Sequence, residues 1–286
     1  MGTTVGLLHP GEMGASVAAA LARAGSEVLW SSEGRSAASR ARADSAGLED
    51  AADLGALLER SQLVVSVCPP DAALEQAQAV AKRGFAGIYV DANAVSPATA
   101  REIGEIVRSG GARFVDGGII GPPAVAPGST RLYLSGDGVR EVAALFAAGP
   151  LEAIPIDGPG GAASALKMCF AAYTKGTSAL LLSIRALATY EGVDDAIVAE
   201  WARSIPELPA RSEGAARGTA RKAWRFIGEM DEIAASFAAA GLPDGFHRAA
   251  GEVYRRLSRY KDAAEAPDLA EVARLLLCED VEGGSS

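Results

Sequence analysis

The chain has 286 residues, of which 49% are hydrophobic, and its formal net charge is −9. This length is long for one domain and suits two, with ample apolar material for a core. The acidic balance argues against a nucleic-acid surface and an anionic membrane face, although a phosphorylated cofactor needs only a local positive site.

The apolar runs and the cysteines indicate whether the protein is a membrane, secreted or cytoplasmic protein. No run approaches the ~20 residues that a helix needs to cross a bilayer. The first run, which begins at Val5, is too short for a secretory signal and is broken by Pro10. The 3 cysteines lack metal-ligand spacing, so the sequence predicts neither a disulfide framework nor a metal site. We therefore expect a reduced, cytoplasmic protein.

The chain opens with a strand, a glycine turn and a helix. The apolar run Val5–Leu8 has the length of a buried strand, and an alanine-rich helical segment follows the turn His9–Gly14. This order is typical of the first unit of a dinucleotide-binding fold, where a pyrophosphate lies against the helix N-terminus. A βα turn that binds no nucleotide is the alternative.

The turn supplies the first candidate cofactor residues. Gly11 would let a pyrophosphate approach the backbone, and Gly14 would let the helix pack closely on the strand. Glu12 and Met13 lie between them. His9 occupies the first glycine position of the usual G-x-G-x-x-G pattern, which would be awkward for His if its φ were positive.

The first half of the chain alternates strands with helices. The expected strands are Val5–Leu8, Glu27–Trp30, Leu63–Val67, Gly87–Val90, Arg113–Val115, Arg131–Leu134 and Ala153–Ile156. A helix should begin at Ser96, since Pro97 suits its first position. The alternation predicts a parallel, doubly wound sheet of the Rossmann type in residues 1–160, with helices on both faces.

In such a sheet the ligand lies beyond the C-terminal strand ends. After the second strand the chain supplies the candidate residues Ser31, Ser32, Arg35 and Ser36. Hydroxyls and an arginine can bind a 2′-phosphate through charge-assisted hydrogen bonds, so the sequence favours NADP, with NAD possible. Glu33 could bind a ribose hydroxyl or face solvent. We expect Cys68, Pro69 and Asn93, in the next two loops, at the same site.

The second half is predicted to be helical. A helical pattern from Ala162 to about Tyr190 follows a glycine turn, so we assign a long helix and an all-α domain to residues 161–286. The further helices are expected at Asp195–Ser204, Ser212–Phe226, Glu229–Ala240, Asp244–Tyr260 and Asp268–Leu277. They are separated by Pro206, Gly228, Gly241–Pro243 and Pro267. The polar tail Glu279–Ser286 is expected to fray.

Four stretches carry a resemblance to a known family. They are the glycine turn with its Met13-Gly14 pair, Val90–Pro97 with its Ser-Pro end, Phe114–Gly121 and Gly161–Phe170. In order and spacing they resemble the β-hydroxyacid dehydrogenases, the group of 3-hydroxyisobutyrate and 6-phosphogluconate dehydrogenases. The stretches span roughly two thirds of the chain. The last third resembles that of a bacterial subgroup whose helical domain is poorly characterised.

The resemblance implies an NADP-dependent oxidoreductase that transfers a hydride between the nicotinamide and a small hydroxy acid or related carbonyl compound. It implies that Lys167 is the general acid/base, and it places the substrate beside Gly117, Gly118 and Ile119. It also implies a homodimer in which the helical domain completes the partner's active site.

The chemistry of Lys167 supports this role. Oxidation of an alcohol needs a base for the hydroxyl proton, and the reverse reaction needs an acid. The positive helix end and partial burial both disfavour the charged form of a lysine near a helix start. Helical spacing puts Thr174 on the same stripe as Lys167, where it could line a substrate cleft. The alternative, a surface lysine, fits poorly with the apolar neighbours Leu166 and Met168.

Some positions depart from the family or stay open. Ile120 stands where the family typically has Ser, and Phe170 and Ala171 stand where it has Asn, so the pocket is expected to be more apolar. His247 could act as an acid or base, although a packing role is favoured, and Arg225 could pair with Glu229 or bind a substrate anion. An imine reductase-like enzyme, against which Lys167 counts, and a non-catalytic NADP-binding protein remain alternatives.

Overall fold

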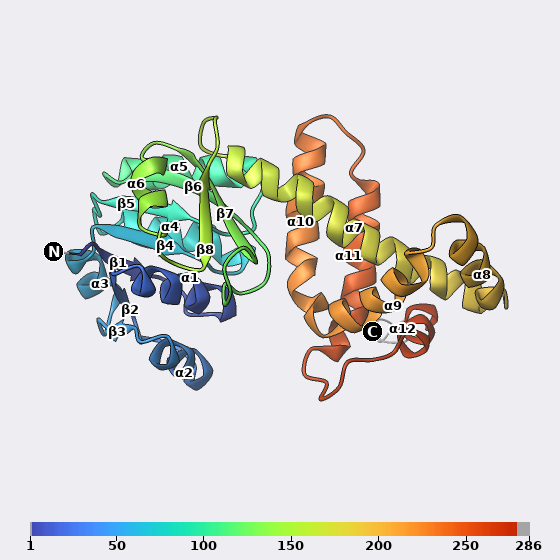
Figure 1. The fold of residues 1–286 in the computed structure, drawn as a ribbon. Helices are drawn as coiled ribbons and strands as arrows, with labels where there is room; N and C mark the ends of the chain where they lie inside the picture. Colours follow the sequence, from blue (N-terminus) through green and yellow to red (C-terminus); the bar gives the residue numbers. More distant parts are fainter. Residues whose placement is uncertain (1, 279–286) are drawn as a thin grey trace, which may run out of the picture. The chain divides into compact units, whose positions relative to one another are not determined.

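The computed structural model describes residues 2–278 (Figure 1). The chain divides into two compact units, of which the first ends at Met168 and the second begins at Cys169. The first contains a β-sheet with helices, and the second is helical, as predicted for the fold class. The expectation for Glu279–Ser286 lies outside the described residues. Within the described range, no helix has the length and apolar character needed to span a membrane.

The sheet is mostly parallel. Its strands are β1 Thr4–Leu7, β2 Glu27–Trp30, β3 Glu49–Asp50, β4 Leu63–Ser66, β5 Ile88–Asp91, β6 Arg113–Ile120, β7 Thr130–Gly136 and β8 Leu151–Pro155. They lie in the order β3-β2-β1-β4-β5-β6-β7-β8. All neighbouring strands run parallel except β6 and β7. The Rossmann-type prediction is confirmed, and the expectation of a wholly parallel sheet is wrong at this one pair.

Strand β6 is also longer than the predicted Arg113–Val115. It continues to Ile120, and Gly117–Ile120 pair with β7 beyond the point where β5 ends. Two adjacent glycines usually weaken a strand, which is why the sequence pattern stops short. Here close packing requires them, since a β-carbon on Gly118 would lie 2.6 Å from the Ala163 carbonyl oxygen. The two-residue strand β3 carries no apolar pattern and was not predicted.

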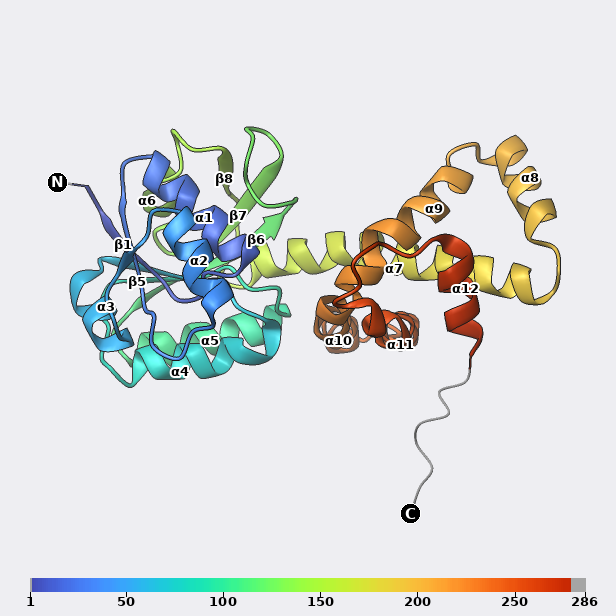
Figure 2. The same cartoon turned by 90° about the horizontal axis from the view of Figure 1, so that it is seen from below.

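Helices cover both faces of the sheet (Figure 2). One face carries α1 Glu12–Arg23, α2 Ala37–Ser45 and α6 Val139–Ala144, whose apolar residues share one core cluster with the sheet. The other face carries α3 Leu54–Arg60, α4 Ala73–Ala81 and α5 Pro97–Ser109, which share a second cluster. As predicted, Ser96 caps α5, accepting from the Thr99 amide, and Pro97 is its first residue.

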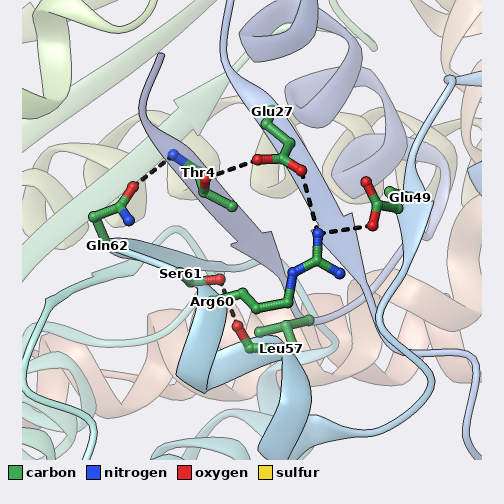
Figure 3. Close-up of polar contacts among 7 residues, drawn as sticks. All are labelled: Thr4, Glu27, Glu49, Leu57, Arg60, Ser61 and Gln62. Atoms are coloured by element: carbon green, nitrogen blue, oxygen red, sulfur yellow. Dashed lines mark hydrogen bonds and ion pairs between the residues drawn. The ribbon is translucent and has the colours of Figure 1, made fainter. Parts of the chain in front are cut away.

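A polar network joins the starts of the first strands (Figure 3). Arg60 donates to Glu27 over 3.2 Å and to Glu49 over 2.7 Å, and Thr4 donates to Glu27 over 2.9 Å. These side chains are about half exposed, and exposed ion pairs contribute little to stability. Burial of Leu57, on the same helix as Arg60, contributes more. The network lies at the amino ends of the strands, and the opposite edge is left for a ligand.

The second unit is built from helices. Its elements are most of α7 Ala162–Tyr190, then α8 Asp194–Ser204, α9 Leu208–Thr219, α10 Ala223–Ala239, α11 Gly245–Leu257 and α12 Leu269–Leu277. The predicted bounds of α7 are confirmed. The prediction that a helix ends at Gly228 is wrong. The helical chain is interrupted at the 3₁₀ turn Ala220–Lys222 instead, and α10 runs through this glycine. The cost of about 1 kcal/mol for an interior glycine is offset by burial of residues such as Met230 and Ile233.

Buried polar contacts hold α7 to its neighbours within this unit. Arg185 binds both carboxylate oxygens of Asp194, over 2.6 and 2.7 Å, and also donates to Ser212. Lys175 pairs with Glu229 over 2.8 Å, and the Tyr254 hydroxyl donates to the Lys175 carbonyl. Glu229 therefore has a lysine as its ion-pair partner.

His247 packs inside the helical unit. Its ring centroid lies 4.2 Å from that of Phe237 and 5.2 Å from that of Phe246. Burial lowers the pKa of His247, which is consistent with a neutral ring among aromatic neighbours. These contacts favour the packing role over that of an acid or base.

Candidate active site

The predicted cofactor residues lie in loops that leave one edge of the sheet. Strand β1 lies between β2 and β4, and the helices that follow β1 and β4 cover opposite faces. Such a reversal opens a crevice at the carboxyl ends of the strands, where α/β proteins bind nucleotides. The loops after β1, β2, β4 and β5, together with the first turn of α1, carry all the predicted cofactor residues.

The glycine turn joins β1 to α1 in the manner expected. A β-carbon on Gly14 would lie 2.0 Å from the His9 carbonyl oxygen, so only glycine allows this helix to start so close to the strand. Gly11 is the N-cap of α1, with φ −70°, and a β-carbon there would meet no protein atom within 4 Å. Within the described residues, no side chain caps this helix start.

These features fit a dinucleotide phosphate. A helix N-terminus presents N–H groups and a positive dipole end to an anion. The space beside Gly11 admits a ligand close to the backbone. Glu12 is exposed in the first turn, and Met13 packs partly against the core of the sheet. Residues from Gly11 to Gly14 can therefore hold a pyrophosphate through the backbone.

The serines after β2 are engaged within the protein. The Ser31 hydroxyl donates to the Ala52 carbonyl over 3.2 Å, and the Ser32 amide donates to Asp50 over the same distance. The Ser36 hydroxyl accepts from the Ser39 amide and so caps α2. Both Ser31 and Ser36 thus have structural roles in this loop.

Arg35 turns back from this loop onto the glycine turn. Its Nη2 donates to the Leu8 carbonyl over 2.9 Å, and its Nη1 lies 2.6 Å from Nε2 of His9. Burial, and then the charge of Arg35, lower the pKa of His9 to about 4. The His9 ring is therefore neutral at pH 7 and can accept from the guanidinium. The φ of His9 is not positive, so the awkward conformation does not arise.

Sequence reasoning missed two further arginines. Arg42 donates through Nε to the Pro10 carbonyl over 2.9 Å, and Arg40 donates to the Ser32 carbonyl over 2.8 Å. Both lie on α2, the helix that follows the β2 loop. Their only sequence signal was a short basic cluster after a capping serine. Together with Arg35 they place three guanidinium groups at this edge, where the carboxylate of Asp50 accepts from the Ser32 amide.

Asn93 joins the loops that follow β4 and β5. Its Oδ1 accepts from the Cys68 amide over 2.6 Å, and its Nδ2 donates to the Ser66 hydroxyl and to Asp91. The Asn93 side chain is buried, so its amide positions the Cys68–Pro69 loop from within. Burial raises the pKa of the Cys68 thiol to about 12, so Cys68 is not a reactive thiolate.

Two buried carboxyl groups lie side by side on β5 and β6, where Asp91 pairs in register with Asp116. Burial and then the negative charge of Asp116 raise the pKa of Asp91 well above its ordinary value. Asp91 is therefore protonated where an exposed aspartate would be ionised.

Asp116 anchors the start of α7. Its Oδ2 accepts from the Ser135 hydroxyl (2.9 Å), the Gly161 amide (2.8 Å) and the Ser164 amide (3.0 Å), and its Oδ1 accepts from the Ser164 hydroxyl (2.5 Å). A carboxylate at a helix N-terminus also interacts favourably with the helix dipole. Asp116 thus fixes the helix that carries Lys167.

The same strand holds Lys167 at a second point. The Lys167 amine donates to the Ile119 carbonyl over 2.7 Å, and a β-carbon on Gly118 would lie 3.1 Å from the Lys167 β-carbon. Ile119 is three residues beyond Asp116, where β5 has ended, which puts it about 10 Å past that strand. The Lys167 amine therefore lies beyond the carboxyl edge of the parallel strands, the edge that the cofactor loops leave.

The structure gives Gly117 and Thr174, which were predicted to bind the substrate, contacts within the protein. Gly117 lies inside β6, where a β-carbon would be 3.0 Å from the Asp91 carbonyl oxygen, so packing explains this glycine. The Thr174 hydroxyl donates within its own helix, to Phe170 at 3.1 Å. No group of metal-binding side chains occurs in residues 2–278.

The comparisons with known proteins agree with this geometry. Residues 4–146 match the NAD binding domain of 6-phosphogluconate dehydrogenase. The chain belongs to this family. Residues 188–257 match a domain of unknown function, DUF1932. Membership in the family gives the chain the fold of NAD(P)-dependent dehydrogenases and indicates a nicotinamide cofactor.

One relative of this chain is itself an uncharacterised protein. An uncharacterised 28.5 kDa protein of Methanothermus fervidus is 32% identical over 173 residues, which are 60% of this chain and 66% of that protein. The chain thus matches slightly less than two thirds of that relative's length.

Two solved structures extend the likeness. Conserved protein MTH1747, of unknown function and described as similar to 3-hydroxyacid dehydrogenases, is 26% identical with a TM-score of 0.68, over 91% of this chain and all of that one. A Mycobacterium tuberculosis 3-hydroxyisobutyrate dehydrogenase with L-serine has a TM-score of 0.72 at 17% identity, over 97% of this chain and all of that one, and shares the fold.

Two alanine substitutions separate the roles of the turn glycines. Gly14→Ala should destabilise the protein by about 1–3 kcal/mol, because its methyl group meets a backbone oxygen. Gly11→Ala should leave the urea unfolding midpoint nearly unchanged but weaken NADPH binding at least about tenfold, since its methyl group fills the space beside the helix start. Wild-type NADPH affinity in a folded Gly11→Ala variant would exclude a pyrophosphate at this turn.

Substitution of Asp91 should change how stability depends on pH. The raised pKa means that the folded state keeps a proton that the unfolded chain releases above about pH 4. The native protein therefore loses stability as pH rises, by up to about 1.4 kcal/mol per pH unit, until the folded-state pKa is reached. Asp91→Asn removes this loss, so its unfolding free energy relative to wild type should grow from pH 4.5 to 8. If urea unfolding gives the same free-energy difference between variant and wild type at every pH in that range, Asp91 is not protonated in the folded state.

Proposed function

We propose that the protein is an NADP-dependent oxidoreductase that transfers a hydride between the nicotinamide and a small hydroxy acid or related carbonyl compound. The observation that carries the proposal is the position of the Lys167 amine, 2.7 Å from the Ile119 carbonyl and beyond the carboxyl edge of the strands. The glycine turn and Arg35 lie at that same edge.

Each group has a distinct task in this proposal. The start of α1 binds the pyrophosphate, and the backbone at Gly11 allows its close approach. Arg35 supplies the positive charge that a 2′-phosphate requires. Cys68, Pro69 and Asn93 shape the wall formed by the loops after β4 and β5. The cofactor, when bound, accepts or delivers the hydride.

Lys167 moves the proton. In the oxidative direction its neutral amine takes the proton of the substrate hydroxyl, and in the reductive direction its ammonium returns one to the carbonyl oxygen. The Ile119 carbonyl accepts from the amine and so orients it. Asp116 acts through the helix start and keeps the amine in place.

At the proposed substrate end of the site, apolar residues stand at positions where the family typically has polar ones. Ile120 is buried at the end of β6, where the resemblance led us to expect Ser. Phe170 and Ala171 follow the lysine in place of Asn. Ile120 favours a substrate with a small apolar substituent over a strongly polar one. A panel of hydroxy acids and cyclic imines, followed by NADPH absorbance, distinguishes this activity from imine reduction and from binding without turnover.

We also propose that the protein is a homodimer. Large apolar side chains are exposed on the helical unit, among them Leu187 at 60%, Tyr190 at 72% and Leu277 at 40%. Exposed apolar surface of this kind marks association sites. Light scattering at micromolar concentration should give twice the chain mass, and Leu187→Arg should shift the protein toward monomer. A monomeric mass for the wild type would rule the proposal out.

The cofactor prediction concerns Arg35. NADPH should bind more tightly than NADH, and Arg35→Ala should weaken NADPH binding by about 1.5–3 kcal/mol, the range for a charged hydrogen bond, with little effect on NADH. Titration of cofactor fluorescence measures both affinities. Equal affinities in the wild type would refute the preference for NADP.

The catalytic prediction concerns Lys167. Lys167→Met should reduce turnover by roughly 10²–10⁴, the contribution of a positioned acid or base, while NADPH affinity holds. Lys167→Arg should not restore turnover, because a guanidinium stays protonated. Lys82→Met, at an exposed helix end, is the control and should turn over normally. Wild-type turnover in the Met variant would remove Lys167 from the mechanism.

A further inference from the structure

His9 is the one position at which the glycine turn departs from the usual pattern. Its side chain is half-buried and points to the loop after β2, where its Nε2 lies 2.6 Å from Nη1 of Arg35. Nothing in the local turn geometry requires histidine, since its φ is not positive. Its contact with Arg35 joins two segments that are 26 residues apart in the chain.

Because the His9 ring is neutral, it can accept a hydrogen bond from Arg35. A guanidinium has only donors, so Nε2 must be the acceptor and the ring proton must lie on Nδ1. Desolvation and the neighbouring arginine both keep the ring neutral. Nδ1 of His9 and Nε of Arg35 are buried and have no hydrogen-bond partner among the described residues. Both atoms are donors, so neither competes with Nε2 of His9 for the guanidinium.

Arg35 is held at two points, and only one of them is a side chain. Nη2 donates to the Leu8 carbonyl, which any residue at position 8 would provide. Nη1 depends on His9. Arg40 and Arg42 are held by the carbonyls of Ser32 and Pro10, so neither depends on this histidine. Removal of the acceptor at position 9 would therefore release Arg35 selectively.

We propose that His9 is a positioning residue that fixes the guanidinium of Arg35 and thereby sets the preference of this protein for a 2′-phosphate. The inference rests on the proposed function, in which Arg35 binds the 2′-phosphate of NADP. A side chain already held in its binding geometry loses less conformational freedom when the ligand arrives. The histidine thus replaces the usual glycine because it contributes to cofactor selection.

The test compares two substitutions that differ in one property. His9→Phe keeps a planar ring but has no acceptor, whereas His9→Gln can place an amide oxygen near the position of Nε2. We expect His9→Phe to reduce the ratio of NADPH to NADH affinity about tenfold, with NADH affinity unchanged, and His9→Gln to keep the ratio within about threefold of wild type. The same comparison with 2′,5′-ADP and 5′-AMP isolates the 2′-phosphate. If His9→Phe does not fold, His9→Leu replaces it.

The outcomes separate the inference from the function on which it rests. A wild type without preference for NADPH refutes the NADP proposal, and the inference with it. A wild type that prefers NADPH, with the preference unchanged in the acceptor-free variant, overturns the inference alone. Tighter NADPH binding in that variant, or equal loss in the Phe and Gln variants, also overturns it, since the first means obstruction and the second means that the acceptor does not matter.

Discussion

The position of the candidate catalytic lysine depends on one buried carboxylate. Asp116 lies in the middle of β6 and accepts four hydrogen bonds, three of them from Gly161 and Ser164 at the start of α7. Without these donors, a fully buried carboxylate would be strongly unfavourable. With them it joins sheet and helix. Burial, and then the negative charge of Asp116, raise the pKa of the neighbouring Asp91. Lys167 lies about one and a half turns into this helix, so the same contacts fix its position.

The topology brings the other groups to the same edge. Because β1, β2, β4 and β5 are parallel, their carboxyl ends and the loops that leave them converge. Because β7 runs antiparallel, β6 extends past that edge and presents the Ile119 carbonyl to Lys167. The antiparallel pair is thus what carries the lysine-binding segment beyond the parallel strands. Family membership indicates a nicotinamide cofactor, and the arginines at this edge suit a phosphorylated one.

Much of this arrangement could be predicted from residue patterns, and the exceptions have physical reasons. The bounds of α7 follow from a glycine turn and a long run without a helix breaker. The sequence pattern did not predict the end of β6, because Gly117 and Gly118 are weak strand formers. The structure needs glycine at position 118 because a helix packs closely there. The contact of His9 with Arg35 depends on pairing of β1 with β2, and the role of Asp116 on a helix 45 residues later. No local pattern encodes such distant partners.

A crystal structure with NADPH tests the central claim most directly. The account predicts the pyrophosphate at the start of α1 beside Gly11, the 2′-phosphate on Arg35, and the nicotinamide on the side of the crevice where Lys167 lies. The amine should then face the ring across the space for a substrate. NADPH bound elsewhere, or with its nicotinamide turned away from Lys167, would contradict the assignment of this edge as the active site.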